Sequence, residues 1–109
     1  MNQGRFPVLS ALTCVLNRFE YPGYSSLGEQ LTLKETGGAI AVWSSSGFSF
    51  PEATEALNAK LFQAYASGRK PIGDVVLEAL RSYAHDGNTA NHLKTYTLIG
   101  DPAVTIAAP

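Results

Sequence analysis

The stretch FPVLSALTC, residues 6–14, decides the fold class of this chain. It runs from Phe6 to Thr13 without a charged side chain and ends at the only cysteine of the sequence. A continuous apolar run of this length is typical of a strand that is covered on both faces of a sheet. Pro7 suits the first residue of such a strand, where a missing backbone N–H is tolerated. We therefore predict a buried strand from Phe6 to Thr13, with Cys14 at its carboxyl end.

The segments that follow alternate between helix and strand. A second apolar run, Ala39 to Trp43, predicts another buried strand, and Ser-x-x-Glu capping boxes at Ser26 and Ser49 predict two helix starts. Apolar residues at helical spacing predict a third helix, which Pro71 opens and Gly87 ends. A polar loop (residues 86–92) and two short extended segments (95–99 and 103–106) complete the chain. This order predicts an α/β fold with a mainly parallel sheet and helices on both faces. Because the sheet is thin, we expect it to be part of a larger one.

The composition limits the classes of partner. The chain has 109 residues, 45% of them hydrophobic, and a formal net charge of -1, which fits one globular domain over residues 1–109. Its Lys and Arg residues are scattered, so we expect no nucleic-acid partner. Its apolar runs are shorter than the ~20 residues that span a bilayer, so we expect no membrane partner. No signal-peptide pattern opens the chain, and its compartment is not predicted.

Two interpretations of Cys14 are open from the residues alone. Ligands of an open parallel sheet bind beyond the carboxyl ends of its strands, so a thiol there would be a nucleophile. Such a nucleophile needs a base to form the thiolate and amides to bind an oxyanion. The alternative is that the thiol is a small apolar side chain in the core, as free cysteines often are.

The two histidines do not complete a site by their spacing. We expect His85, near the end of a helix, and His92, in a loop, to be solvated surface residues, although either could fold beside Cys14. Their spacing matches no usual zinc pattern, and the sequence has no phosphate-binding glycine loop. We therefore expect no metal and no cofactor.

Three stretches together carry a resemblance to a known family. The chain resembles the C-terminal part of the gingipain-type cysteine peptidase domain over nearly its whole length, and the order and spacing of the three stretches match. The closing Tyr-x-Leu-Ile-Gly-Asp-Pro-Ala run is the most distinctive of them. The stretches are Gly4-Arg5-Phe6-Pro7 leading to Leu12-Thr13-Cys14, Ser26-Leu27-Gly28-Glu29 ahead of Gly37-Gly38-Ala39-Ile40-Ala41-Val42, and Tyr96 to Ala103.

The resemblance implies a caspase-like three-layer sandwich and hydrolysis of peptide bonds through a Cys–His pair. It implies that Cys14 is the nucleophile, that the backbone amide of Cys14 supplies part of the oxyanion hole, and that the substrate is a peptide or protein. By a looser correspondence, Trp43, Ser44 and Ser45 would line the substrate cleft. Members of this family are commonly secreted or bound to the cell surface.

One departure from the family qualifies these expectations. The family's catalytic histidine lies upstream of the cysteine, and no residue before Cys14 is histidine. We therefore expect a domain without its first strands, nearly inactive until its missing N-terminal half supplies the base. Its exposed apolar sheet edge would favour self-association. Two alternatives stay open: a non-catalytic binding or scaffold module, and a small-molecule enzyme that uses His85 or His92.

Overall fold

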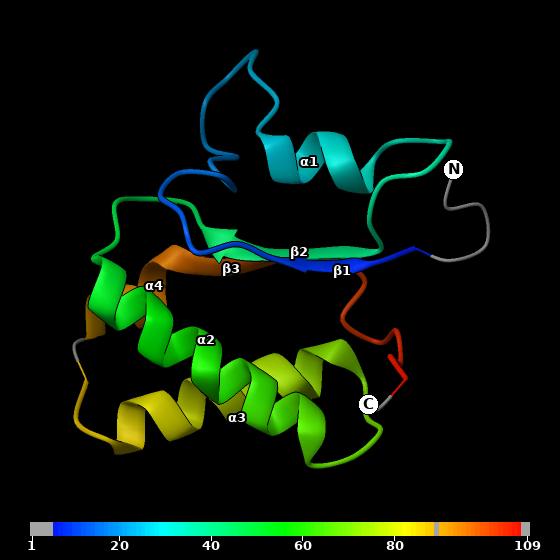
Figure 1. The fold of residues 1–109 in the computed structure, drawn as a ribbon. Coiled ribbons are helices and arrows are strands. Elements are labelled where there is room, and N and C mark those ends of the chain that lie inside the picture. Colours follow the sequence, from blue (N-terminus) through cyan, green and yellow to red (C-terminus); the bar gives the residue numbers. More distant parts are fainter. Residues whose placement is uncertain (1–5, 89, 108–109) are drawn as a thin grey trace.

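The sheet of the protein has three strands in the order β1-β2-β3 (Figure 1). The computed structural model of the chain describes residues 6–88 and 90–107. β1 (Val8–Ser10) is parallel to β2 (Ala41–Ser45), whereas β3 (Tyr96–Gly100) is antiparallel to β2. Ser10 pairs with Trp43 and Ser45 with Tyr96. The carboxyl ends of β1 and β2 and the start of β3 therefore lie together at one end of the sheet, which we call its carboxyl edge.

The α/β class is confirmed, but the sheet is mixed rather than mainly parallel. The reason is the short connection into β3, which follows α4 (Ala90–Thr95) without an intervening residue. A strand parallel to β2 would need a connection that returns the chain to the end of the sheet at which β2 begins. The chain instead enters β3 at the end at which β2 finishes, so β3 runs antiparallel to β2.

Helices cover both faces of this sheet (Figure 1). α1 (Leu27–Thr32) lies on one face, and the antiparallel pair α2 (Pro51–Ala66) and α3 (Ile72–His85) lies on the other. The main core fills the space between the sheet and the pair α2–α3. Its buried residues are Trp43, Leu57, Leu61, Ala64, Ile72, Val75, Val76, Ala79, Tyr83 and Tyr96.

Helical spacing predicted the buried face of α3 correctly. Of the six residues on its predicted apolar face, Leu80 is partly buried against the core and the others are buried: Ile72, Val75, Val76, Ala79 and Tyr83. The capping box of α1 is also present. Ser26 Oγ accepts from Glu29 N–H at 3.3 Å, and Glu29 Oε2 accepts from Ser26 N–H at 2.7 Å.

Other predicted elements differ from the structure. The strand expected from Phe6 to Thr13 covers only Val8–Ser10, and part of the polar loop expected over residues 86–92 belongs to α4. The segment 103–106 forms a single bridge, between Thr105 and Pro71, instead of a strand. The capping box at Ser49 is absent: the N-cap of α2 is Phe50, and no side chain caps that helix.

A buried amide joins the segment after β1 to the other two strands. Asn17 is fully buried, and its Nδ2 lies 2.9 Å from Thr97 O in β3 and 3.2 Å from Val42 O in β2. Gly28 of α1 lies directly against this side chain, because a Cβ there would be 1.9 Å from Asn17 Oδ1. Asn17 is therefore enclosed between α1 and the sheet.

Candidate active site

Cys14 lies in a loop, residues 11–17, that leaves the carboxyl end of β1 and follows the end of β2. We call it the Cys14 loop. Three of its backbone N–H groups donate to β2 or to the residues just after it: Ala11 to Trp43 O at 3.0 Å, Val15 to Gly47 O at 3.2 Å, and Asn17 to Ser45 O at 3.1 Å. The sheet thus holds the loop on both sides of the half-buried thiol. The predicted position at the carboxyl edge of the sheet agrees with this placement.

The backbone immediately after Cys14 is strained. Val15 has a φ of 54°, and among the described residues it is the one non-glycine with positive φ. A β-branched residue in this region costs on the order of 1–3 kcal/mol and persists where the surroundings impose it. The hydrogen bond from Val15 N–H to Gly47 O is the contact that holds this turn. The turn fixes the direction in which the Cys14 side chain leaves the loop.

The hydrogen-bond partners of the thiol all belong to Ser49, the residue before the N-cap of α2. Ser49 N–H donates to Cys14 Sγ at 3.4 Å, and Sγ in turn lies 3.4 Å from Ser49 O and 3.6 Å from Ser49 Oγ. The N–H and hydroxyl of Ser49 stabilise the thiolate and lower the pKa of Cys14 below its ordinary value. The positive end of the α2 dipole lies at the same place and acts in the same direction.

We expect the native thiol to ionise at a lower pH than the thiol of the unfolded chain. A lowered pKa means that the thiolate is present at pH values where the unfolded chain is still protonated. The rate of alkylation by iodoacetamide, followed by intact mass across pH, should therefore have its midpoint below that of the chain in urea. Because Cys14 is the only cysteine of the sequence, a single thiol adduct is assigned to it without ambiguity. Ser49→Ala, which keeps the N–H donor and removes the hydroxyl, should give an intermediate midpoint. Coincident profiles for native and unfolded chains would contradict the assigned role of Ser49.

A buried tyrosine lies close enough to the thiol for their charges to interact. Tyr96 pairs with Ser45 across the sheet, and its ring centroid is 5.2 Å from that of Trp43. Burial raises the pKa of Tyr96, and the charge of an ionised Cys14 adds to the shift. The phenol is therefore a neutral group beneath the Cys14 loop.

The expectation that His92 is solvated is wrong. Its side chain is buried, with 3% of the residue exposed, because α4 carries it inward beside the segment that precedes α2. His92 Nε2 accepts a hydrogen bond from Phe50 N–H at 3.2 Å, and the two rings lie with centroids 6.2 Å apart. The structure therefore brings His92 to the neighbourhood of Ser49, the residue that bonds to Cys14.

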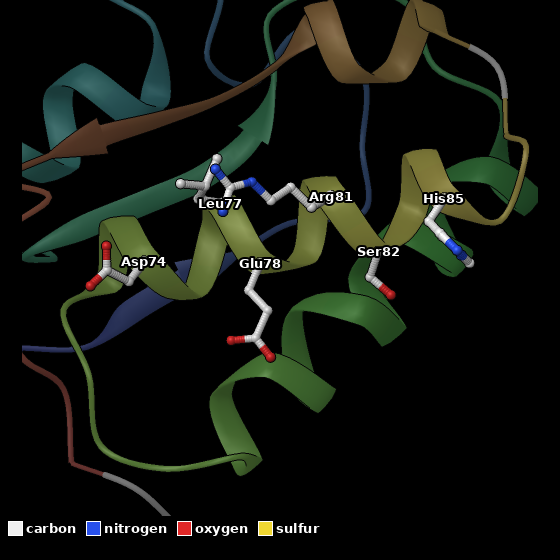
Figure 2. A pocket seen from close by; sticks show the side chains of 6 residues that line it. All are labelled: Asp74, Leu77, Glu78, Arg81, Ser82 and His85. Carbon is white, nitrogen blue, oxygen red and sulfur yellow. The ribbon is translucent and has the colours of Figure 1, made fainter.

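His85 is on the surface, as predicted. Its side chain is 91% exposed, and its nearest charged contact is Asp86 at 3.8 Å. Figure 2 shows it at one end of a shallow depression whose labelled side chains, from Asp74 to His85, all project from α3. A depression built by a single helix brings no second element to His85, which gives no support to an enzyme centred on this residue.

The three residues expected to line a substrate cleft are all buried in β2. Trp43, Ser44 and Ser45 are each at most 1% exposed. Ser44 Oγ donates to Ala11 O at 3.2 Å, and Ser45 Oγ donates to Gly47 O at 2.8 Å. The two serine side chains thus contact Ala11 of the Cys14 loop and Gly47, which accepts from Val15 N–H of the loop. Their part in substrate binding stays a prediction.

A groove of about 630 Å³ runs beside the outer edge of β1. Its lining comes from β1, α2, α3 and the C-terminal segment, and no charged residue contributes to it. The lining residues are Phe6, Val8, Leu9, Ser10, Ile40, Leu61, Phe62, Tyr65, Ile72, Val75, Thr105, Ile106 and Ala107. β2 occupies the other edge of β1, so in the described chain the outer edge of this strand has no strand partner.

Within residues 6–88 and 90–107, no group of three or more His, Cys, Asp or Glu side chains could hold a metal ion. No helix in the same ranges has both the length and the apolar character needed to cross a bilayer.

Comparison with known proteins identifies a family match for this chain. A family model described as Peptidase family C25 matches residues 1–107. Neither the curated proteins nor the solved structures contain a significant match. The match covers the Cys14 loop, the whole sheet and all four helices.

Proposed function

The chain belongs to peptidase family C25, the gingipain family, and on that basis we propose that Cys14 is the nucleophile of a cysteine endopeptidase. The observation that carries the proposal is the setting of the thiol. It is half-buried at the carboxyl edge of the sheet, fixed by the Cys14 loop, and hydrogen-bonded to Ser49 at the positive end of α2. A thiolate in such surroundings is the reactive form of cysteine.

The proposed reaction begins with attack of the Cys14 thiolate on the carbonyl carbon of a peptide bond. The carbonyl π electrons move to oxygen, and the resulting oxyanion accepts hydrogen bonds from backbone amides. Among the described residues no carbonyl accepts a bond from the N–H of Cys14, which leaves this donor for the oxyanion. Collapse of the intermediate expels the amine, which takes a proton from a general acid, and water then hydrolyses the acyl-enzyme.

The proton carrier of this reaction is proposed to come from polypeptide outside the described residues. His92 Nε2 already accepts from Phe50, and His85 projects from α3 into solvent. The outer edge of β1 and the uncharged groove beside it offer a docking site for an additional strand of low charge. We propose that the strand bearing the base occupies this edge, which places it next to the strand that leads to Cys14.

The buried residues of β2 receive a supporting role in this proposal. Ser44 and Ser45 hold Ala11 and Gly47, two of the positions that set the course of the Cys14 loop. Trp43 supports the same end of the sheet through Tyr96. They would position the rim against which an extended peptide lies, with their side chains beneath it.

A peptidyl acyloxymethyl ketone tests the proposal without requiring the general base. Such a reagent carries a short peptide, and the thiolate displaces its carboxylate leaving group to form a thioether, so the rate of this reaction reports peptide binding next to the nucleophile. We expect a panel of these reagents to include members that modify native Cys14 at least about tenfold faster than the urea-unfolded chain. Iodoacetamide, which carries no peptide, corrects for the reactivity of the thiol itself.

The control variant Cys14→Ala should take up no label from any reagent of the panel. If every peptidyl reagent follows iodoacetamide in its native-to-unfolded ratio, the thiol has no peptide site beside it. The chain would then be a binding or scaffold module that has kept the half-sheet.

A further inference from the structure

Two consecutive backbone amides connect the thiol to a buried imidazole. Ser49 N–H donates to Cys14 Sγ at 3.4 Å, and the next amide, Phe50 N–H, donates to His92 Nε2 at 3.2 Å. Both amides belong to the segment between β2 and α2, which we call the 49–50 segment. Its position relative to the thiol therefore depends on the group that Phe50 contacts.

His92 is well placed to fix this segment. It is buried in α4, and the end of α4 is joined to the end of β2 by two hydrogen bonds to Thr95 O, from Ser46 N–H at 2.8 Å and from Ser46 Oγ at 3.0 Å. The imidazole therefore has a defined position relative to the sheet and to the Cys14 loop. The ring of Phe50 lies beside it, while that side chain is 71% exposed.

Beyond its bonds to Cys14 and His92, the 49–50 segment is tied to α2 by Phe50 O, which accepts from Thr54 N–H at 3.0 Å. The N-cap of α2 is Phe50, and no side chain caps that helix. Ser49, which has the residue type and spacing of a cap, uses its N–H and hydroxyl at the thiol instead. The bond from Phe50 N–H to His92 is therefore the contact that fixes the amide next to the one that serves Cys14.

The same bond shows which nitrogen of the imidazole is the acceptor. An Nε2 that accepts a hydrogen bond is unprotonated, because the N–H form of that nitrogen can only donate. His92 thus has its acceptor directed at Phe50 in the described arrangement and is not free to take the thiol proton through Nε2.

We propose that His92 is a positioning residue for Cys14, acting through the hydrogen bond to Phe50 N–H that holds Ser49 against the thiol. The positioning role of His92 depends on the proposed function only in treating Cys14 as the nucleophile. The effect on the thiol can be measured whether or not the chain hydrolyses peptides.

The test compares the pH profile of Cys14 alkylation by iodoacetamide in three variants of His92. His92→Leu removes the acceptor and keeps an apolar side chain in the buried site. His92→Gln places an amide oxygen near the position of Nε2, whereas the shorter His92→Asn does not reach it.

We expect the alkylation profile of His92→Gln to match that of the wild type. For His92→Leu and His92→Asn we expect a higher midpoint and a rate near pH 7 that is about threefold lower, since the loss of thiolate is partly offset by greater nucleophilicity. His85→Leu, at the exposed histidine, is the matched control and should leave the profile unchanged.

Hydrogen exchange gives an independent measurement in the wild-type chain and in each variant that folds. Loss of the acceptor should speed exchange of the Phe50 amide by at least about tenfold relative to amides within α2. If His92→Leu does not fold, the comparison of His92→Gln with His92→Asn still decides the matter. Equal alkylation midpoints for these two variants, or a folded His92→Leu with the wild-type midpoint, would overturn the proposal. A shifted midpoint in a chain that no peptidyl reagent labels would support the role of His92 and contradict only the peptidase proposal.

Discussion

With imidazole in the buffer as a diffusible base, replacement of Cys14 by alanine is expected to reduce peptide hydrolysis by at least about 10³-fold, since loss of the nucleophile removes the covalent pathway. The chain has no second cysteine to replace it. Because we propose that the base lies outside the described residues, the assay should measure kcat/KM on fluorogenic peptides with and without imidazole in the buffer. A diffusible base should raise the activity of the wild type and leave Cys14→Ala at the background rate.

Cys14→Ser is the control that separates geometry from chemistry. Its hydroxyl occupies nearly the same space and can bond to Ser49, so the fold should be retained. A serine hydroxyl ionises far less readily than a thiol, so it should remain near the background rate at neutral pH. Hydrolysis by Cys14→Ala at the wild-type rate would mean that another group or a contaminating enzyme carries the activity.

Asn17→Asp is expected to destabilise the fold by about 3–5 kcal/mol at pH 7, a large part of the stability of a domain of this size. The amide of Asn17 donates to Val42 O and Thr97 O inside the protein. A carboxylate has no proton to donate, and it would place an unpaired charge against carbonyl oxygens. The loss should appear as a lower midpoint in urea denaturation followed by circular dichroism.

The pH dependence of this variant gives a second check. Burial would raise the pKa of the introduced carboxyl above its unfolded value. The neutral form, which can donate one hydrogen bond, is then favoured in the folded state, and the destabilisation should be smaller near pH 4 than at pH 7. Asn88→Asp is a matched control. Asn88 also donates to a carbonyl, Tyr83 O, but it is exposed, so its loss should cost less than about 1 kcal/mol. An equal decrease in the free energy of unfolding for the two variants would show that the buried bonds of Asn17 to β2 and β3 do not stabilise the fold as proposed.

Much of the fold could be predicted because local signals and tertiary packing agree. The apolar runs around Val8 and Val42 specify strands, and the spacing from Ile72 to Tyr83 specifies the buried face of α3. The same signals failed where tertiary contacts decide. The run from Ala11 to Thr13 is as apolar as a strand, yet the hydrogen bonds of the Cys14 loop turn it away from the ladder.

The site was predictable only in part, for the same physical reason. Cys14 was proposed as the nucleophile from its place after an apolar strand and from the family resemblance, and this role stays a prediction; its position beyond the carboxyl end of β1 follows from the topology. Ser49 was missed because its capping-box spacing explained it locally, whereas its actual partner lies 35 residues away in sequence. His92 was missed because α4 has a polar sequence, and its partner Phe50 is 42 residues away. Contacts at such separations have no periodic signature.

The hydrogen bonds of the Cys14 loop also restrict how this sequence can change in evolution. The segment 11–17 has a fixed length, because its bonds to Trp43, Ser45 and Gly47 tie it at three points to β2 and to the residues just after that strand. One inserted or deleted residue there would shift Cys14 out of reach of Ser49 and move Asn17 out of its enclosed position. The stretch from Phe19 to Tyr24 lies exposed and ends before α1, so it can gain or lose residues at little cost. Length variation among homologues should therefore be frequent in the second stretch and rare in the first.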